Sequence, residues 1–290
     1  MYTFSIENIK NFNLKHTFEC GQCFRWWKNS DESYSGIVSG NIFNVKISGN
    51  TLHVESSMHD SQKFFEEYID NNRDYSEIKR KISVNDSNMN KAVEFGYGMR
   101  ILKQDHWETL VSFIISANNN IPRIIKTIEK LSELYGAPFE INDKTYYAFP
   151  TPQDIIENQE DKLAQCGLGF RCRYIKHAAE MVLYGEIDLN TIEKLDTGLA
   201  KKELMRINGV GPKVADCTLL YSYGRYDVFP TDIWIKRIVE TLYFGTEKRI
   251  SEIHEFAHDR FGGYAGFAQQ YLFYYARENK VGAKLIRISE

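Results

Sequence analysis

The chain has 290 residues, of which 43% are hydrophobic and 26% charged, a composition typical of a soluble globular protein with one large domain or two to three smaller ones. Its formal net charge of −3 gives no sign of a polyanionic partner, so any nucleic-acid surface has to be a local patch. No apolar run is long enough to span a bilayer and the N-terminus lacks a basic stretch before an apolar one, so we expect a cytoplasmic protein without a membrane partner.

The first third of the chain predicts antiparallel strands between residues 34 and 56. Apolar and polar residues alternate in "FNVKIS" (43–48), which is the two-residue period of a half-buried strand. The tripeptide "SGN" occurs at 39–41 and again at 48–50, and its residues favour turns. We therefore expect a β meander in this part of the chain.

From about residue 61 the hydrophobic period becomes helical, with apolar residues every three or four positions. Helices are predicted over 105–115, 121–136, 171–185, 198–206, 212–223, 232–243, 251–261 and 264–279. The predicted fold class is α+β, with a small antiparallel β-rich N-terminal domain and flanking helices over 1–90 and a larger all-α region over 91–290. We expect the helical region to form two subdomains with an active site between them.

The stretch "INGVGPKVADC" (207–217) predicts a tight turn between two helices. Gly209 and Gly211 permit backbone angles that other residues avoid, and Pro212 suits the first position of a helix. Such a turn exposes backbone amides at a helix N-terminus, which favours phosphate binding by Asn208, Gly209, Val210 and Gly211. A dinucleotide fold needs a strand before the glycines and a Walker loop needs Gly-Lys-Ser/Thr, and neither is present. A plain helix–helix turn with a surface lysine remains an alternative.

Lys213 lies in the first turn of the second helix, where the helix dipole and partial burial both disfavour its charged form. The neutral amine is the nucleophilic form. Asp232 in "VFPTDIW" is placed to cap the next helix. A helix of roughly 18 Å from Pro212 and an extended return of roughly 23 Å over 225–231 bring Asp232 beside Lys213. This pair is suited to attack on a sugar carbon of DNA, with the carboxylate stabilising oxocarbenium-like charge.

"LMRINGVGPKVADC" followed by "VFPTDIW" resembles the helix–hairpin–helix–Gly/Pro-Asp superfamily of DNA glycosylases. Four further segments resemble its 8-oxoguanine DNA glycosylase branch: "GQCFRW" (21–26), "SANNNIPRI" (116–124), "GLGFRCRY" (167–174) and "YAGFAQQYLF" (264–273). These segments run in order through nearly the whole chain. The resemblance implies a repair enzyme that flips 8-oxoguanine out of duplex DNA and excises it, followed by β-elimination at the abasic site.

The resemblance also implies roles for individual residues. Lys213 matches the nucleophile that attacks C1′ and forms a Schiff base, and Asp232 matches the catalytic carboxylate. Gly21 matches the glycine whose carbonyl accepts the N7 hydrogen of 8-oxoguanine; unmodified guanine has an acceptor there instead. The residues that match the rest of the lesion-base pocket are Phe273 and Cys217, on the two faces of the base, and Gln269, at its Watson–Crick edge. Core packing is the alternative for Phe273.

Other matched residues imply contacts with the opposite strand. Asn118 matches the residue that fills the space left by the extruded nucleotide. Arg123 and Arg171 match arginines that recognise the orphaned cytosine, and Phe170 occupies the wedge position. Surface solvation or a phosphate contact is the alternative for either arginine. The partner implied is therefore double-stranded DNA with 8-oxoguanine opposite cytosine, bound by a monomer that is associated with the nucleoid in a prokaryote or is nuclear in a eukaryote.

Four positions depart from the family pattern. Phe170 stands where a tyrosine is familiar, Trp234 where a histidine is, Ala276 where an acid is, and Tyr221 where a methionine is. If the familiar histidine and acid touch, their joint absence indicates a different phosphate contact or hydration. These changes bear on opposite-base stringency and rate, and leave the reaction class unchanged.

Two features raise metal binding as an alternative. "HEFAH" (254–258) fits the zinc-protease pattern HExxH, with Glu278 as a candidate third ligand, but charged Asp259 follows where such helices are usually buried. Cys20 and Cys23 form a CxxC without a second pair, and five cysteines are an odd number. We therefore expect structural thiols, no metal and no cofactor. A DNA-binding module without catalysis is a further alternative.

Overall fold

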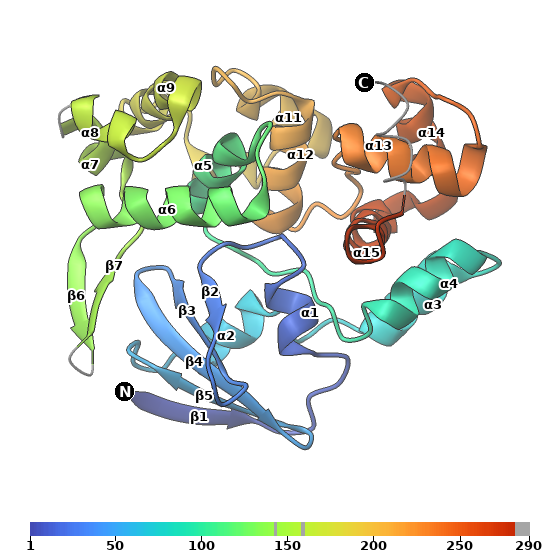
Figure 1. The fold of residues 1–290 in the computed structure, drawn as a ribbon, viewed down its shortest axis with the longest axis horizontal. Helices are drawn as coiled ribbons and strands as arrows, with labels where there is room; N and C mark the ends of the chain where they lie inside the picture. The colour runs from blue at the N-terminus through green and yellow to red at the C-terminus, as the bar shows by residue number, and fades with distance from the viewer. Residues whose placement is uncertain (142–143, 158–159, 282–290) are drawn as a thin grey trace.

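The computed structural model describes residues 1–141, 144–157 and 160–281. Figure 1 shows a β sheet that lies on one side of a larger group of helices. The sheet has the strand order β1-β5-β4-β3-β2, and every neighbouring pair is antiparallel. Its strands are β1 (Tyr2–Ile6), β2 (Trp26–Lys28), β3 (Tyr34–Val38), β4 (Asn41–Ser48) and β5 (Thr51–Ser56).

The predicted meander is present as β3, β4 and β5. Val45 of β4 pairs with Tyr34 on one side and with Val54 on the other, and all three side chains are buried. The glycines of the two "SGN" turns, Gly40 and Gly49, both have positive φ. Helix α2 (Gln62–Tyr68) packs on this sheet through Phe65, which is fully buried and stacks on Phe43 with ring centres 5.0 Å apart.

The helical region contains the eight predicted helices with ends shifted by a few residues, the short helices over 152–157, 160–165 and 189–192 were not predicted, and the α+β fold class is confirmed. Its helices are α5 (His106–Ser116), α6 (Ile121–Tyr135), α7 (Pro152–Glu157), α8 (Glu160–Gln165), α9 (Cys172–Leu183), α10 (Leu189–Ile192), α11 (Thr197–Leu204), α12 (Pro212–Tyr221), α13 (Ile233–Val239), α14 (Ile250–Phe261) and α15 (Ala265–Glu278). Asp105, Asn120 and Asp232 each cap a helix by accepting a hydrogen bond from the amide three residues later. Residues 282–290, which the predicted helical region includes, lie outside the described residues.

The chain has two hydrophobic cores, and the boundary between them does not coincide with the change from strands to helices along the sequence. One core belongs to the sheet, α1 (Leu14–Phe18) and α2, and it includes residues up to Ile69 together with Leu102. The helices α3 (Tyr75–Ser83) and α4 (Ser87–Phe95) contribute instead to the larger core. Figure 1 shows them extending from the sheet side toward α14 and α15. These two helices therefore join the N-terminal part of the chain to its last helix.

The helical region also contains a two-stranded hairpin that was not predicted. Strands β6 (Pro138–Ile141) and β7 (Lys144–Tyr147) pair antiparallel and extend from the helices along the sheet domain (Figure 1). Tyr146 of β7 stacks on Trp27 of β2, with ring centres 6.1 Å apart. The hairpin therefore adds a contact between the two regions. Among the described residues, no helix combines the length and the apolar character needed to cross a membrane.

Candidate active site

The turn between α11 and α12 requires its glycine at position 209 for two reasons. Gly209 has φ +85°, and a Cβ there would lie 2.4 Å from the ring of Tyr174. Gly211 provides the N-cap of α12 and Pro212 its first residue. Val210 and Val214 are both buried, so the turn is fixed to the two helices by apolar packing. The predicted helix–hairpin–helix geometry is therefore present.

The hairpin amides are only partly free to bind an anion. The Asn208 amide donates to Nδ1 of His177 at 3.2 Å, and the Val210 amide donates to the Ile207 carbonyl at 3.0 Å. The amides of Gly209 and Gly211 make no hydrogen bond to another described residue. A cavity of about 740 Å³ beside the hairpin is lined by Asn208 and Gly209 together with basic side chains of α9, namely Arg173, Lys176 and His177. Phosphate binding at this hairpin stays a prediction; Arg173 and Lys176 supply positive charge beside it, and Glu180 of the same cavity supplies a negative charge.

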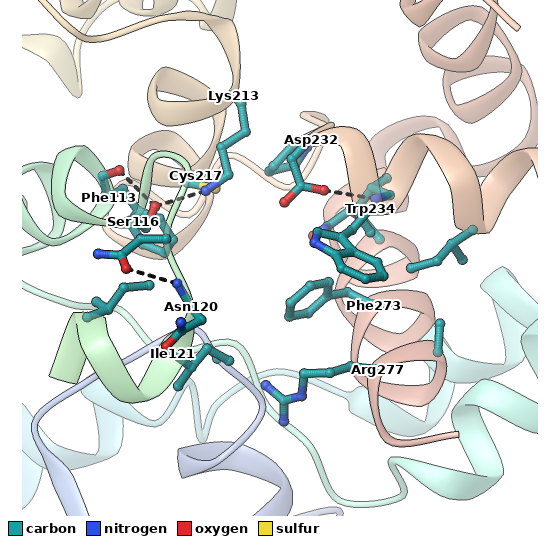
Figure 2. Close-up of a pocket in the computed structure, with 18 of the residues that line it drawn as sticks. Phe113, Ser116, Asn120, Ile121, Lys213, Cys217, Asp232, Trp234, Phe273 and Arg277 are labelled. Atoms are coloured by element: carbon teal, nitrogen blue, oxygen red, sulfur yellow. Dashed lines mark hydrogen bonds between the residues drawn. The ribbon is translucent and has the colours of Figure 1, made fainter. Parts of the chain in front are cut away.

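Lys213 extends from the first turn of α12 into a second cavity, and its side chain is half-buried. Its Nζ donates a hydrogen bond to Oγ of Ser116, the last residue of α5, at 3.0 Å. The Ser116 hydroxyl in turn donates to the Phe113 carbonyl at 2.8 Å. The amine also lies 5.0 Å from the centre of the Phe113 ring. These contacts, of which Figure 2 draws the two hydrogen bonds, hold the amine at one wall of the cavity.

Asp232 stands on the opposite wall, at the start of α13. Its Oδ1 accepts a hydrogen bond from the Ile235 amide at 2.8 Å, which confirms the predicted N-cap. Figure 2 shows its carboxylate facing the space that the Lys213 amine also faces. The structure records no ion pair between these two described side chains, so the cavity separates an amine from a carboxylate.

The cavity between Lys213 and Asp232 has a volume of about 440 Å³, within the range of roughly 300–1,000 Å³ that is typical of ligand pockets. All six residues predicted for catalysis and lesion recognition line it: Gly21, Lys213, Cys217, Asp232, Gln269 and Phe273. These residues come from both ends of the chain, and they meet because α15 packs beside the loop that follows α1. The structure thus brings this predicted set together.

The lesion-recognition residues form the walls of the cavity. Gly21 has φ +93°, and a Cβ there would lie 3.3 Å from Phe273 and 3.0 Å from Nη1 of Arg277, so only glycine fits without strain. Gln269 is 4% exposed, and its Oε1 has no hydrogen-bond partner among the described residues. Burial raises the pKa of the Cys217 thiol to about 12, so this side chain is an uncharged apolar surface at neutral pH.

The residues predicted to contact the opposite strand lie together outside the cavity. Asn118 is exposed, with φ +50°, and Arg123 and Phe170 are also exposed. Arg171 is different: it is 5% exposed and donates to the main-chain carbonyls of Ala117 and Asn118. Arg171 therefore braces the loop that carries Asn118, and its recognition of the orphaned base stays a prediction.

Three departures from the family pattern have clear structural settings. Tyr221 is buried, stacks on Phe113 with ring centres 5.2 Å apart, and donates a hydrogen bond to Oε1 of Gln270. Trp234 lines the cavity and is 45% exposed, so it stands at the cavity mouth. Ala276 is buried in the cavity wall. A small apolar residue and a large ring therefore replace the familiar acid and histidine.

The metal-site alternative finds no support in the geometry. His254 makes a hydrogen bond with Oγ1 of Thr231 at 3.0 Å, and burial lowers its pKa. Glu278 pairs with Arg277 instead of approaching the histidines. The described part of the chain holds no group of three or more metal-ligating side chains. All five cysteines, each within that part, are free.

Two cavity residues carry roles that the sequence did not predict. Ser116 lies inside the quoted segment "SANNNIPRI", but its contact with Lys213 depends on how α5 packs against α12. Arg277 lines the cavity four residues after Phe273 and eight after Gln269. This spacing places all three on one helix face, a signal that was available in the sequence.

Comparisons with known proteins agree with this geometry. Residues 5–110 match the family model of the 8-oxoguanine DNA glycosylase N-terminal domain, and residues 111–260 match that of the HhH-GPD superfamily of base excision DNA repair proteins. The chain is 32% identical over 214 residues to a probable N-glycosylase/DNA lyase from Methanothermobacter thermautotrophicus, covering 67% of this chain and 68% of that protein.

Solved structures are similar over almost the whole chain. MBOgg1 in complex with a low affinity DNA ligand is 49% identical, with a TM-score of 0.93 and 96% of both chains covered. The Clostridium acetobutylicum 8-oxoguanine glycosylase/lyase, in complex with double-stranded DNA containing cytosine opposite 8-oxoguanine, is 42% identical, with a TM-score of 0.92 and the same coverage. The resemblance drawn from the sequence is confirmed. The chain belongs to the HhH-GPD superfamily of base excision DNA repair proteins and carries the N-terminal domain of 8-oxoguanine DNA glycosylases.

Proposed function

We propose that the chain is an 8-oxoguanine DNA N-glycosylase with an associated abasic-site lyase activity. The observation that carries this proposal is that Lys213 and Asp232 line opposite walls of one cavity that is large enough to hold a nucleobase. Its 42% identity to the Clostridium acetobutylicum 8-oxoguanine glycosylase/lyase supports the same substrate and both activities. Excision and strand cleavage are then two steps at one lysine.

The base enters the cavity only after it leaves the duplex stack. One face of the base then packs on the ring of Phe273 and the other on the uncharged thiol of Cys217. The Gly21 carbonyl accepts the N7 hydrogen of 8-oxoguanine, and the unpaired Oε1 of Gln269 accepts a hydrogen from the Watson–Crick edge. Guanine lacks the N7 hydrogen and would place two acceptors against each other at Gly21.

The chemistry starts with the lone pair of the neutral Lys213 amine. Nζ forms a bond to C1′ while the bond from C1′ to N9 breaks, and the base leaves with that electron pair and takes up the proton that the newly bonded Nζ releases. The carboxylate of Asp232 stabilises the positive charge that develops on the sugar. Opening of the sugar ring gives a Schiff base between Nζ and C1′. Loss of a C2′ proton then expels the 3′ phosphate, and water releases the lysine.

The opposite strand is recognised outside the cavity. Asn118 fills the space of the flipped nucleotide, Phe170 wedges into the stack, and Arg123 and Arg171 recognise the orphaned cytosine. The exposed positions of the first three residues support this assignment. The amides of Gly209 and Gly211, with the basic side chains beside them, bind a DNA phosphate.

We further propose that the chain acts as a monomer, within the compartment that holds the chromosome: the cytoplasm of a prokaryote or the nucleus of a eukaryote. Residues 1–90 supply the Gly21 loop and the sheet that supports it. Residues 91–290 supply the nucleophile, the carboxylate and the stacking residues.

Borohydride trapping tests the proposed function. The protein is incubated with a duplex containing 8-oxoguanine opposite cytosine, and sodium borohydride reduces any Schiff base to a stable crosslink. We expect a crosslinked band that a chelator does not diminish and that Lys213→Gln abolishes, while this variant still binds the lesion. A DNA-binding module without catalysis gives no crosslink, and loss of lesion binding in Lys213→Gln would contradict a purely catalytic lysine.

A further inference from the structure

Two polar atoms of α15 in the wall of the active-site cavity lack hydrogen-bond partners among the described residues. They are Oε1 of Gln269, an acceptor, and Nη1 of Arg277, a donor, and both atoms are buried. Gln269, Phe273 and Arg277 follow one another at intervals of four residues, so they share one face of the helix with Phe273 in the middle. An unpaired buried polar atom is costly, so a ligand with an acceptor at one end and a donor at the other would satisfy both.

The guanidinium of Arg277 is held in a fixed orientation by its other nitrogens. Nη2 donates to the Glu19 carbonyl at 2.6 Å, and Nε donates to Oε1 of Glu278 at 2.9 Å. Because the guanidinium is planar, these two bonds set the direction of Nη1. Figure 2 shows the group reaching from α15 toward Ile121, beside Phe273. The third nitrogen is therefore held beside Gly21, in the cavity wall, as a buried donor without a partner among the described residues.

The free Nη1 lies next to the glycine that is expected to recognise N7. It is 3.0 Å from the position that a Cβ of Gly21 would take, and the guanidinium carbon is 5.7 Å from the centre of the Phe273 ring. A base stacked on Phe273 with its Watson–Crick edge at Gln269 places its opposite end one helical turn further along α15. That end carries the atom bonded to C8, the neighbour of N7 in the ring.

We propose that Arg277 is a specificity-determining residue that donates a hydrogen bond from Nη1 to O8 of the flipped base. The inference rests on the proposed function and extends it, because the Gly21 carbonyl and Arg277 then recognise the two atoms that oxidation changes. Guanine has a C8 hydrogen in place of O8 and leaves the guanidinium donor unpaired. Arg277 thus adds a second penalty against the undamaged base, independent of the one at N7.

The test uses two bases that share the N7 hydrogen and differ at position 8. In 9-deazaguanine the N7 hydrogen is present, O8 is absent, and the glycosidic carbon–carbon bond cannot be cleaved. Duplexes with 8-oxoguanine, 9-deazaguanine or a tetrahydrofuran abasic analogue are titrated with protein that carries Lys213→Gln, so that no base is excised. Dissociation constants are compared with and without Arg277→Met.

We expect Arg277→Met to weaken binding of the 8-oxoguanine duplex by about 10- to 100-fold, the effect of losing one hydrogen bond from a charged donor. Binding of the 9-deazaguanine and abasic duplexes should stay within about twofold. Arg277→Lys, which keeps a cationic donor, should recover part of the loss. Equal weakening of all three duplexes would show that Arg277 contacts a phosphate, and no weakening of the 8-oxoguanine duplex would show that it contacts no ligand.

Arg277 also donates a hydrogen bond to the Glu19 carbonyl of the Gly21 loop, and a matched variant tests whether loss of this bond, instead of the Nη1 bond, weakens binding. Nε2 of Gln270 donates to the Cys20 carbonyl at 3.2 Å, so Gln270→Met loosens the same loop, removes the acceptor of the Tyr221 hydroxyl and leaves the guanidinium in place. We expect it to weaken 8-oxoguanine and 9-deazaguanine binding equally. If Arg277→Met gives that same pattern, its role is to position the loop and the proposal fails. Absence of borohydride trapping by the unmodified protein would instead refute the proposed function.

Discussion

Ser116 gives the most direct test of how the nucleophile is positioned, because its hydroxyl is the hydrogen-bond acceptor of the Lys213 amine at 3.0 Å. A hydrogen bond between uncharged groups contributes about 0.5–1.5 kcal/mol, and the neutral Lys213 amine is such a donor. Since about 1.4 kcal/mol corresponds to tenfold in rate, Ser116→Ala should slow base excision by about two- to tenfold. The lysine keeps its chemistry but loses the contact that limits its rotamers.

The assay is single-turnover excision of 8-oxoguanine opposite cytosine, with enzyme in excess. Ser116→Thr keeps a hydroxyl on the same carbon and should retain most of the rate, so it controls for changes at the end of α5. The melting temperature of both variants reports whether the fold is intact. A rate for Ser116→Ala within twofold of the unmodified protein would refute the positioning argument, and so would a loss as complete as that of Lys213→Gln.

Three further predictions concern other parts of the chain. Asp232→Asn should slow excision by about 100-fold or more while the melting temperature changes little, because asparagine can still cap α13; an unchanged rate would remove the assigned role. Arg123→Ala should lower the preference for cytosine by about tenfold when excision is measured opposite each of the four bases, and an unaltered preference would show that Arg123 does not recognise the orphaned base. Burial raises the pKa of Glu108 from 4.5 to about 7 despite the ion pair with Arg25. The contribution of the bound proton to the unfolding free energy is therefore complete below pH 4.5 and is lost as pH rises through 7. Glu108→Gln should therefore flatten unfolding free energy against pH between about 4.5 and 7, and an equally steep curve in the variant would contradict this protonation.

Much of the helical region could be predicted because its boundaries are encoded locally. Asp105, Asn120 and Asp232 mark helix starts through their own side chains, and the hydrophobic period defines the buried faces. The strands β6 and β7 were missed because each has only four residues and neither has a fully buried side chain, so no apolar alternation marks them. Their position depends on contacts such as that between Tyr146 and Trp27, which are distant in the chain.

The candidate-site residues that belong to sequence motifs could be predicted, whereas contacts that depend on tertiary packing could not. Lys213 and Asp232 were found from local residues together with the resemblance and Gly21 from the resemblance alone, and the structure places them around one cavity. The burial of Arg171 under the Asn118 loop follows from tertiary contacts that no local pattern contains. The same holds for the contact of Ser116 with the lysine.

Two hydrogen bonds join α15 to the loop that carries Gly21: Gln270 donates to the Cys20 carbonyl, and Arg277 donates to the Glu19 carbonyl. The two residues of each pair are 250 and 258 positions apart in the chain, respectively. Contacts of such long range form late in folding, after the loop-closure entropy has been overcome. In a partly folded chain with α5 packed on α12 and α15 still detached, the Lys213 amine contacts Ser116 before the lesion-recognition cavity has formed. Damage selection therefore depends on the attachment of α15, whereas the contact of Lys213 with Ser116 involves only α12 and α5.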